Sequence, residues 1–211
     1  MAALCLLLVV CFARFVTTEL TLDEIDQELI LSLHNEIRRD QGASNMYKLI
    51  WSDSLEDQAD DVVEECEFQY SSHPAENLGA MFDFPSRARI KAYGKSNMIK
   101  LIIRDGMPST NFKAWAQEKS NVASFETFRC KEGKVCTHYK QIVTSDAQEI
   151  GCAAKYCPII HIRGREKDHA WFLACVYDKR SVAGEPPFER GEACSDCDAK
   201  DKCKHGLCIA P

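Results

Sequence analysis

The chain has 211 residues, of which 45% are apolar, and its formal net charge is −6 at pH 7. This length accommodates one domain with a small appendage, and the apolar content is sufficient for a hydrophobic core. The negative charge argues against a general nucleic-acid-binding protein, a class that depends on clustered basic residues.

Residues 1–18 contain a short apolar run from Leu4 to Val10. This pattern predicts a cleaved secretory signal peptide, although no basic residue precedes the run. The run is shorter than the roughly 20 residues that a membrane-spanning helix needs, and no later segment approaches that length. We therefore expect a secreted, extracellular protein without a transmembrane segment.

The cysteine content agrees with an oxidising compartment. Of the twelve cysteines, ten remain when Cys5 and Cys11 leave with the signal peptide. An even number in a secreted chain predicts that all of them form disulfides. Spacing alone cannot choose among the many possible pairings.

Two helices are predicted in the first third of the chain. Thr21-Leu-Asp-Glu24 has the pattern of a helix-capping box, and an apolar stripe at helical spacing continues towards Gly42. The stripe consists of Leu22, Ile25, Leu29, Leu33 and Ile37. His34, which precedes Asn35 and Arg38, is expected to have a packing or hydrogen-bonding role. The second helix follows Trp51, and its apolar face consists of Leu55, Ala59, Val62, Val63 and Cys66.

Residues 80–112 contain an unusual basic and apolar stretch. Between positions 86 and 106, six cationic side chains are interleaved with apolar ones, and Asp105 is the acidic residue. The cationic residues are Arg87, Arg89, Lys91, Lys95, Lys100 and Arg104. In an acidic protein this stretch suggests an anionic partner such as a lipid headgroup or a sulfated glycan. The alternative is a solvated helical excursion packed on the core.

Two further segments carry candidate functional residues. Asn111 is in position to cap a helix that carries Phe112, Trp115 and Glu118. Cys130 and Cys136 flank a turn rich in Lys and Gly, which predicts a local disulfide loop. Residues 137–143 then read as a strand, with His138 near its start and Tyr139, Ile142 and Val143 packed beneath the loop. Histidine is the commonest metal ligand, although a lone strand histidine can equally be a surface or hydrogen-bonded residue.

The last third contains two predicted strands and a cysteine-dense tail. The strands cover residues 149–157 and 170–177. The tail has the spacing Cys194-x2-Cys197-x5-Cys203-x4-Cys208. A Cys-x2-Cys pair can bind zinc, but secretion and the lack of a second such pair favour disulfides.

Several of these motifs, in this order, resemble signatures of the CAP family (cysteine-rich secretory proteins, antigen 5 and pathogenesis-related 1 proteins). They are Glu76-Asn77-Leu78, Trp115-x2-Glu118, Cys130-x5-Cys136-x-His138-Tyr-x-Gln-Ile-Val143, Gly151-Cys152-x4-Cys157 and Phe172-Leu-x-Cys175-x-Tyr177. The resemblance covers about residues 22–208. Thr137, Lys140 and Thr144 depart from the residues that the family usually has at these positions.

The resemblance implies an α+β fold, a three-layer α-β-α sandwich with a three- or four-stranded antiparallel sheet. This domain would span residues 19–180, followed by a small disulfide-rich hinge at residues 181–211. The resemblance also implies the pairing of the cysteines. The expected pairs are Cys66–Cys157, Cys130–Cys136, Cys152–Cys175, Cys194–Cys203 and Cys197–Cys208.

The family's cleft collects two histidines and two glutamates. Here Glu76, Glu118 and His138 match, but Tyr70 stands at the place of the first histidine and His73 lies three residues later. Two imidazoles with an acidic neighbour can hold a divalent metal such as zinc, whereas one His and one Tyr hold it poorly. We therefore expect no required cofactor, with a metal site at His138 and His73 as the alternative.

The expected function is that of a secreted binding or effector protein without catalysis, similar to the helminth venom-allergen-like members of the family. By this resemblance the expected partners are a lipid or sterol, an anionic glycan or lipid surface, and a host or cell-surface receptor. One alternative is a metal-dependent hydrolase that uses the cleft residues. Another is a receptor-binding ligand that acts through the tail and the basic stretch.

Overall fold

The computed structural model of the chain describes residues 24–71, 75–82 and 111–211. Several sequence predictions lie outside these residues. They are the signal peptide at residues 1–18, the capping residue Thr21, His73, and the basic residues Arg87, Arg89, Lys91, Lys95, Lys100 and Arg104.

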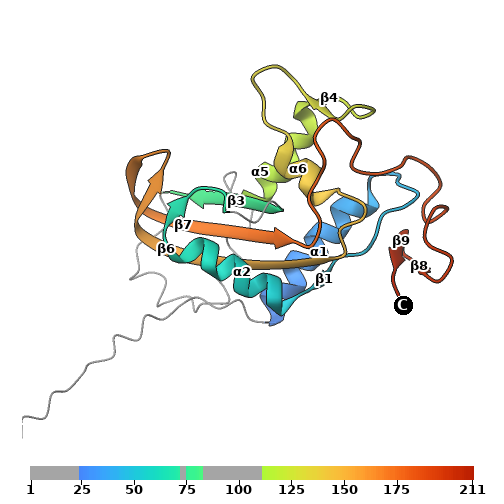
Figure 1. Ribbon diagram of the computed structural model, residues 1–211, viewed down its shortest axis with the longest axis horizontal. Helices are drawn as coiled ribbons and strands as arrows, with labels where there is room; N and C mark the ends of the chain where they lie inside the picture. The colour runs from blue at the N-terminus through green and yellow to red at the C-terminus, as the bar shows by residue number, and fades with distance from the viewer. Residues whose placement is uncertain (1–23, 72–74, 83–110) are drawn as a thin grey trace, which may run out of the picture.

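The described part of the domain consists of a central sheet with helices on both faces (Figure 1). Antiparallel strands β3 (Glu76–Met81), β7 (Arg165–Tyr177) and β6 (Glu149–Ile162) form its core. The two-residue strands β1 (Ile50–Trp51) and β2 (Glu67–Phe68) both pair with β6 in parallel. The predicted sandwich with an antiparallel sheet is therefore confirmed, and the short parallel additions were not predicted.

Alternation along the strands assigns the two faces of the sheet. In β7, Trp171, Leu173 and Cys175 belong to one hydrophobic cluster, whereas Phe172 and Ala174 belong to another. Successive side chains of a strand point to opposite faces, so each cluster lies on its own face. This is why the sequence of β7 reads as a continuous apolar run.

Helix α2 (Asp53–Glu64) covers the face that carries Phe172, and its side chains Leu55, Ala59 and Val63 are buried there. A Cβ atom at Gly151 of β6 would lie 2.0 Å from the backbone nitrogen of Glu56. The helix backbone therefore packs directly on the strand backbone, and a side chain at position 151 would force the two apart.

Helices α1 (Glu24–Arg39), α5 (Asn111–Gln117) and α6 (Thr137–Ile142) contribute to the cluster on the opposite face. The predicted helix with Phe112 and Trp115 is α5, and Glu118 lies just beyond it in the 3₁₀ helix η1 (Glu118–Asn121). The small strands β4 (Val122–Ser124) and β5 (Arg129–Cys130) pair with each other between η1 and α6.

Residues 137–142 form helix α6, so the strand predicted after Cys136 is wrong. Tyr139, Ile142 and Val143 are fully buried, as expected. Their spacing of three and one matches a single helix face and does not match the alternation of a strand. As a result, the backbone N–H of His138 lies in a first helical turn, where it needs a partner from outside the helix.

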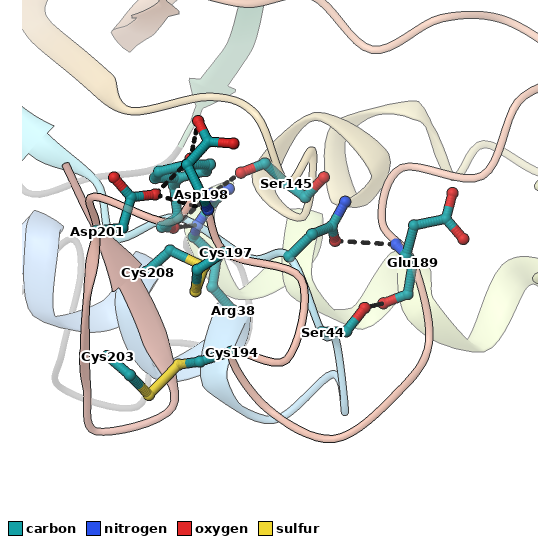
Figure 2. The surroundings of a disulfide bond; sticks show 12 residues. Arg38, Ser44, Ser145, Glu189, Cys194, Cys197, Asp198, Asp201, Cys203 and Cys208 are labelled. Carbon is teal, nitrogen blue, oxygen red and sulfur yellow. Dashed lines mark hydrogen bonds between the residues drawn. A yellow bond between two sulfur atoms is a disulfide. The ribbon is translucent and has the colours of Figure 1, made fainter.

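The tail packs back on the segment that follows α1 (Figure 2). Strands β8 (Lys202–Lys204) and β9 (Leu207–Ile209) pair, and the backbone N–H of Cys208 donates to the carbonyl of Met46 at 2.8 Å. The Tyr47 hydroxyl donates to Asp201 Oδ2 at 2.6 Å and to Asp198 Oδ2 at 3.2 Å. These contacts hold the tail against the domain.

The described residues contain five disulfides, and their pairs are those that the family resemblance implies. They are Cys66–Cys157, Cys130–Cys136, Cys152–Cys175, Cys194–Cys203 and Cys197–Cys208. Within the described ranges, every helix is too short or too polar to cross a bilayer.

Candidate functional site

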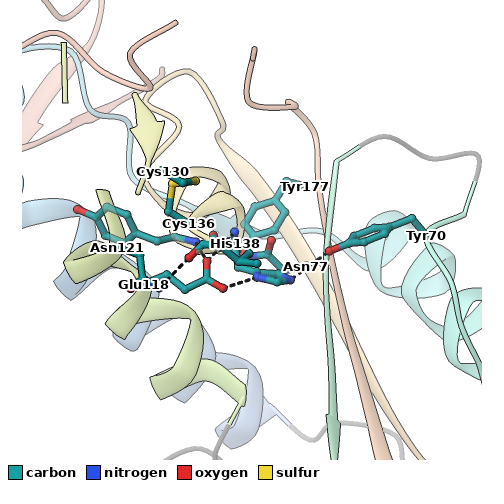
Figure 3. A network of polar contacts seen from close by, with 10 residues as sticks. Tyr70, Asn77, Glu118, Asn121, Cys130, Cys136, His138 and Tyr177 are labelled. Carbon is teal, nitrogen blue, oxygen red and sulfur yellow. Dashed lines mark hydrogen bonds and ion pairs between the residues drawn. A yellow bond between two sulfur atoms is a disulfide. The ribbon is translucent and has the colours of Figure 1, made fainter. Parts of the chain in front are cut away.

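Three of the predicted cleft residues form a hydrogen-bonded chain (Figure 3). Glu118 Oε1 lies 2.7 Å from Nδ1 of His138, and the Tyr70 hydroxyl lies 3.0 Å from Nε2 of the same ring. A carboxylate only accepts, so neutral His138 donates from Nδ1 and accepts the Tyr70 proton at Nε2. Partial burial, helped by the charges of Glu118 and Glu76, raises the pKa of Tyr70, which keeps its hydroxyl a donor.

Glu118 also caps helix α6 from outside. Its Oε2 accepts the backbone N–H groups of His138 and Tyr139 at 3.0 and 3.2 Å. These are the first-turn donors that a helix cannot satisfy by itself. The ring of Trp115 stacks on His138 with centroids 5.8 Å apart. One carboxylate and one aromatic ring therefore fix both the helix and the imidazole.

A second set of buried polar groups supports the site from behind. Asn77 Nδ2 donates to the carbonyl of His138 at 3.0 Å and to the Tyr177 hydroxyl at 3.2 Å. Tyr177 in turn donates to Nε2 of His34 at 3.0 Å, while Nδ1 of His34 donates to the carbonyl of Ile30 at 2.8 Å. His34 thus has the packing and hydrogen-bonding role expected of it, and it ties the site to α1.

A cleft of about 550 Å³ lies beside this chain. Its walls come from the segment before β3, from β5, from α6 and from the segment after β7. The lining includes Tyr70, Ser71, Glu76, Asn77, Phe128, Cys130, Cys136, Thr137, Lys140, Gln141, Arg180, Ser181, Ala183 and Gly184. Among the predicted cleft residues, Tyr70 and Glu76 line it, whereas His138 and Glu118 do not.

Glu76 is separate from the other cleft residues that the family resemblance implies. Its Oε1 accepts the backbone N–H of Ser71 at 3.0 Å and also its hydroxyl, and Glu76 makes no hydrogen bond to Glu118 or His138. Glu76 therefore holds the adjoining loop. His73 lies outside the described residues.

Sequence reasoning missed Lys140 as a cleft residue. The side chain is only 5% exposed, its Nζ donates to the carbonyl of Val182, and it lies 5.1 Å from the centroid of the Phe128 ring. Burial lowers the pKa of Lys140, and the charge of Glu185 partly opposes this. The departure of Lys140 from the family pattern was the one signal in the sequence that could have identified it.

Among the described residues, the donors around His138 do not fit a zinc ion. A carboxylate on one nitrogen of an imidazole commonly prepares the other nitrogen for a metal, but here the Tyr70 hydroxyl occupies that position. Zinc sites in proteins use three or four His, Cys or carboxylate ligands. In the described part of the chain, the one cluster of potential ligands is Cys194, Cys197 and Cys208, and all three are in disulfides.

Replacing Tyr70 by His is expected to raise the affinity for Zn²⁺ by at least about tenfold, because a second imidazole would meet His138. Competition with a chromogenic chelator measures this change. Tyr70→Phe removes the hydroxyl without adding a ligand and is the matched control. The prediction is contradicted if wild type binds as tightly as Tyr70→His. Loss of that binding in His73→Ala would then assign the second imidazole to His73.

Comparisons with known proteins agree with the fold. The model of the cysteine-rich secretory protein family matches residues 31–177. Mouse cysteine-rich secretory protein LCCL domain-containing 1 is 30% identical over 201 residues, covering 87% of this chain and 36% of the relative. The chain thus spans about a third of the length of that curated relative.

Two solved structures are similar in fold. The crystal structure of hookworm platelet inhibitor aligns with a TM-score of 0.64 at 21% identity and covers 89% of this chain and 92% of that one. The crystal structure of NaASP2 with Zn²⁺ aligns with a TM-score of 0.61 at 18% identity and covers 89% and 97%. Identities this low support the shared fold and no finer likeness.

Proposed function

The chain belongs to the cysteine-rich secretory protein family, and on this premise we propose that it is a secreted protein that acts by binding and not by catalysis. The observation that carries the proposal is the Tyr70 hydroxyl on Nε2 of His138. A hydrolase needs a nucleophile or an activated water beside its base. Here the base nitrogen accepts a proton from a phenol with a raised pKa, which is a poor nucleophile.

The cysteines support the same proposal in two ways. Every cysteine in the described residues is in a disulfide, so this part of the chain offers no thiolate nucleophile. Five disulfides also suit an oxidising, extracellular compartment. The predicted signal peptide at residues 1–18 agrees with that location.

We propose a lipid or sterol as the principal ligand, with the basic stretch as the part that meets anionic headgroups or sulfated glycans. Native mass spectrometry of the secreted protein, without added ligand, tests this directly. A co-purified lipid mass that detaches on activation supports the proposal and gives the ligand class. A bare protein mass favours the alternative of a receptor-binding ligand. That alternative predicts that replacing the tail abolishes receptor binding while lipid binding persists.

Charge reversal tests the role of the basic stretch. The triple variant Arg87→Glu, Arg89→Glu and Lys91→Glu is expected to bind anionic liposomes at least about tenfold more weakly, since each basic residue near such a surface contributes about 1 kcal/mol. Liposome co-sedimentation at low salt measures the change. Reversal of three exposed tail lysines, Lys200, Lys202 and Lys204, is the control with equal charge. Equal binding by both variants would contradict a specific role for the stretch.

A metal-dependent hydrolase is the second candidate function. The Glu118–His138 pair favours it, and so does the similarity in fold to NaASP2 with Zn²⁺. The same mass spectra test it, because a zinc-sized adduct that disappears in His138→Ala would support a metal site. Without that adduct, the hydrolase loses its support.

A further inference from the structure

The cleft beside α6 has chemically distinct walls. The wall before and within β3 contributes Tyr70, Ser71 and the Glu76 carboxylate. Other segments of the lining contribute two cationic side chains, Lys140 from α6 and Arg180 from the segment after β7. The lining also has an apolar part. It consists of Phe128, Ala183 and the Cys130–Cys136 disulfide.

Two buried ionisable side chains of the cleft, Glu76 and Lys140, have no oppositely charged contact among the described residues. Glu76 is 6% exposed and Lys140 is 5% exposed. The contacts between acidic and basic side chains among the described residues are Glu118–His138 and Glu64–Lys155, so neither Glu76 nor Lys140 is in one. Buried Glu and Lys are rare in proteins unless they are paired, because burial removes the water that stabilises each charge.

Hydrogen bonding is also incomplete at both groups. Glu76 Oε2 is buried and has no hydrogen-bond partner, since both bonds from Ser71 go to Oε1. The Lys140 ammonium has three donors, and one of them is used by the carbonyl of Val182. Arg180 is exposed at the same cleft. Among the described residues, the lining thus leaves an unused acceptor on Glu76 and unused cationic donors on Lys140 and Arg180.

A ligand that carries one cationic and one anionic group would satisfy both the free carboxylate oxygen of Glu76 and the free donors of Lys140 and Arg180. We propose that this cleft binds a small zwitterion, a free amino acid or a short peptide. Its ammonium group would bind Glu76, and its carboxylate would bind Lys140 and Arg180. Bonds of this kind, with both partners charged, are about twice as strong as neutral ones. A cleft of about 550 Å³ has the size of a small-molecule site.

This site differs from the metal position that the family resemblance implies. The metal position is Nε2 of His138, which is bonded to Tyr70 and does not line the cleft. The site is also tested independently of the proposed lipid ligand, which is tested by native mass spectrometry without added ligand and by charge reversal in the basic stretch. Either proposal can therefore fail while the other holds.

Affinity-selection mass spectrometry on the full disulfide-bonded protein tests the inference. The probes are a pool of free tripeptides, the same pool N-acetylated, and the same pool C-amidated. We expect wild type to retain free tripeptides, and acetylation to reduce retention by about tenfold or more because it removes the ammonium group. Retention of both free and acetylated pools to the same extent, or of neither pool, would overturn the proposal.

Variants of the cleft residues test which residue binds the ammonium end of the ligand and which binds the carboxylate end. Glu76→Gln is expected to lose about tenfold or more in retention of the free pool. Lys140→Met is expected to show a smaller preference for the free pool over the C-amidated pool than wild type, since only Arg180 would remain to bind the carboxylate. The exposed residues Glu126 and Lys134 provide the controls Glu126→Gln and Lys134→Met. Circular dichroism checks that each variant is folded, and the modified pools test wild type even where a variant is not.

Discussion

Replacing Arg38 by Met is expected to lower the free energy of unfolding by about 3–5 kcal/mol. The guanidinium is completely buried and donates six hydrogen bonds to five backbone carbonyls. The carbonyls are those of Tyr47, Ile142, Thr144, Ser145 and Ala147, and Figure 2 shows the cation beside Ser145, close to the tail disulfides. Methionine would fill a similar space and donate no hydrogen bond. The carbonyls of Thr144 and Ser145 would each keep one backbone donor, but those of Tyr47, Ile142 and Ala147 would lose their described partner, so the loss is large.

Equilibrium unfolding in guanidinium chloride with intact disulfides measures this effect. Arg39 provides the matched control, because it is the next residue of α1 and is exposed. Arg39→Met is expected to change the unfolding free energy by less than about 0.5 kcal/mol. Equal midpoints for the two variants would contradict the role assigned to Arg38.

The second large effect is a loss of stability in acid that originates at His34. Burial lowers the pKa of His34 to about 4, from the model-peptide value of 6.5. The unfolded chain therefore binds more protons than the folded chain between pH 6.5 and 4. The stability that His34 contributes is complete above pH 6.5 and falls as the pH drops through this window. The full loss is about 3 kcal/mol, because one pKa unit corresponds to about 1.4 kcal/mol.

Comparing wild type with a His34 variant at two pH values separates this contribution from the titration of carboxylates. His34→Gln is expected to be less stable than wild type at pH 7.5, since it loses the contacts with Ile30 and Tyr177. That deficit is expected to shrink by about 3 kcal/mol between pH 7.5 and 4, because Gln takes up no proton. The exposed His205 provides the control His205→Asn. A deficit that stays constant with pH would show that His34 does not titrate in the folded state as described.

The two predictions depend on the same architectural feature. Arg38 and His34 are one helical turn apart on α1 and both face the interior. Arg38 holds the carbonyls at and after the end of α6, and His34 meets Tyr177, which shares Asn77 with His138. Helix α1 thus positions the base of the site, and loss of either residue is expected to loosen α6 as well.

Local pattern was sufficient for most of the fold. Helices α1 and α2 follow from apolar spacing, and β7 follows from a run of apolar residues too short for a typical helix. The strand predicted at 137–143 was wrong, because the spacing of Tyr139, Ile142 and Val143 fits one face of a helix and not the alternation of a strand. The helix there depends on Glu118, whose carboxylate caps it from another part of the chain.

The residues of the candidate site were predictable from the sequence, but the hydrogen bonds between them were not. Glu76, Glu118, His138 and Tyr70 were all named from motif positions. The sequence could not show that Tyr70 would bond His138 across 68 residues, or that Glu76 would turn to Ser71 instead. Lys140 appeared only as an irregularity, since nothing local shows that a lysine in a six-residue helix is buried.

The sequence by itself determined the properties that depend on neighbours along the chain. These are the amphipathic helices, the strands with continuous apolar runs, and an even number of cysteines at spacings similar to those of a known family. Tertiary structure alone decided which charges would be satisfied. The carbonyls around Arg38 and the walls around Lys140 come from segments far apart in the chain. Hydrogen bonds act over about 3 Å, so the partners of these groups are defined only after the chain has folded.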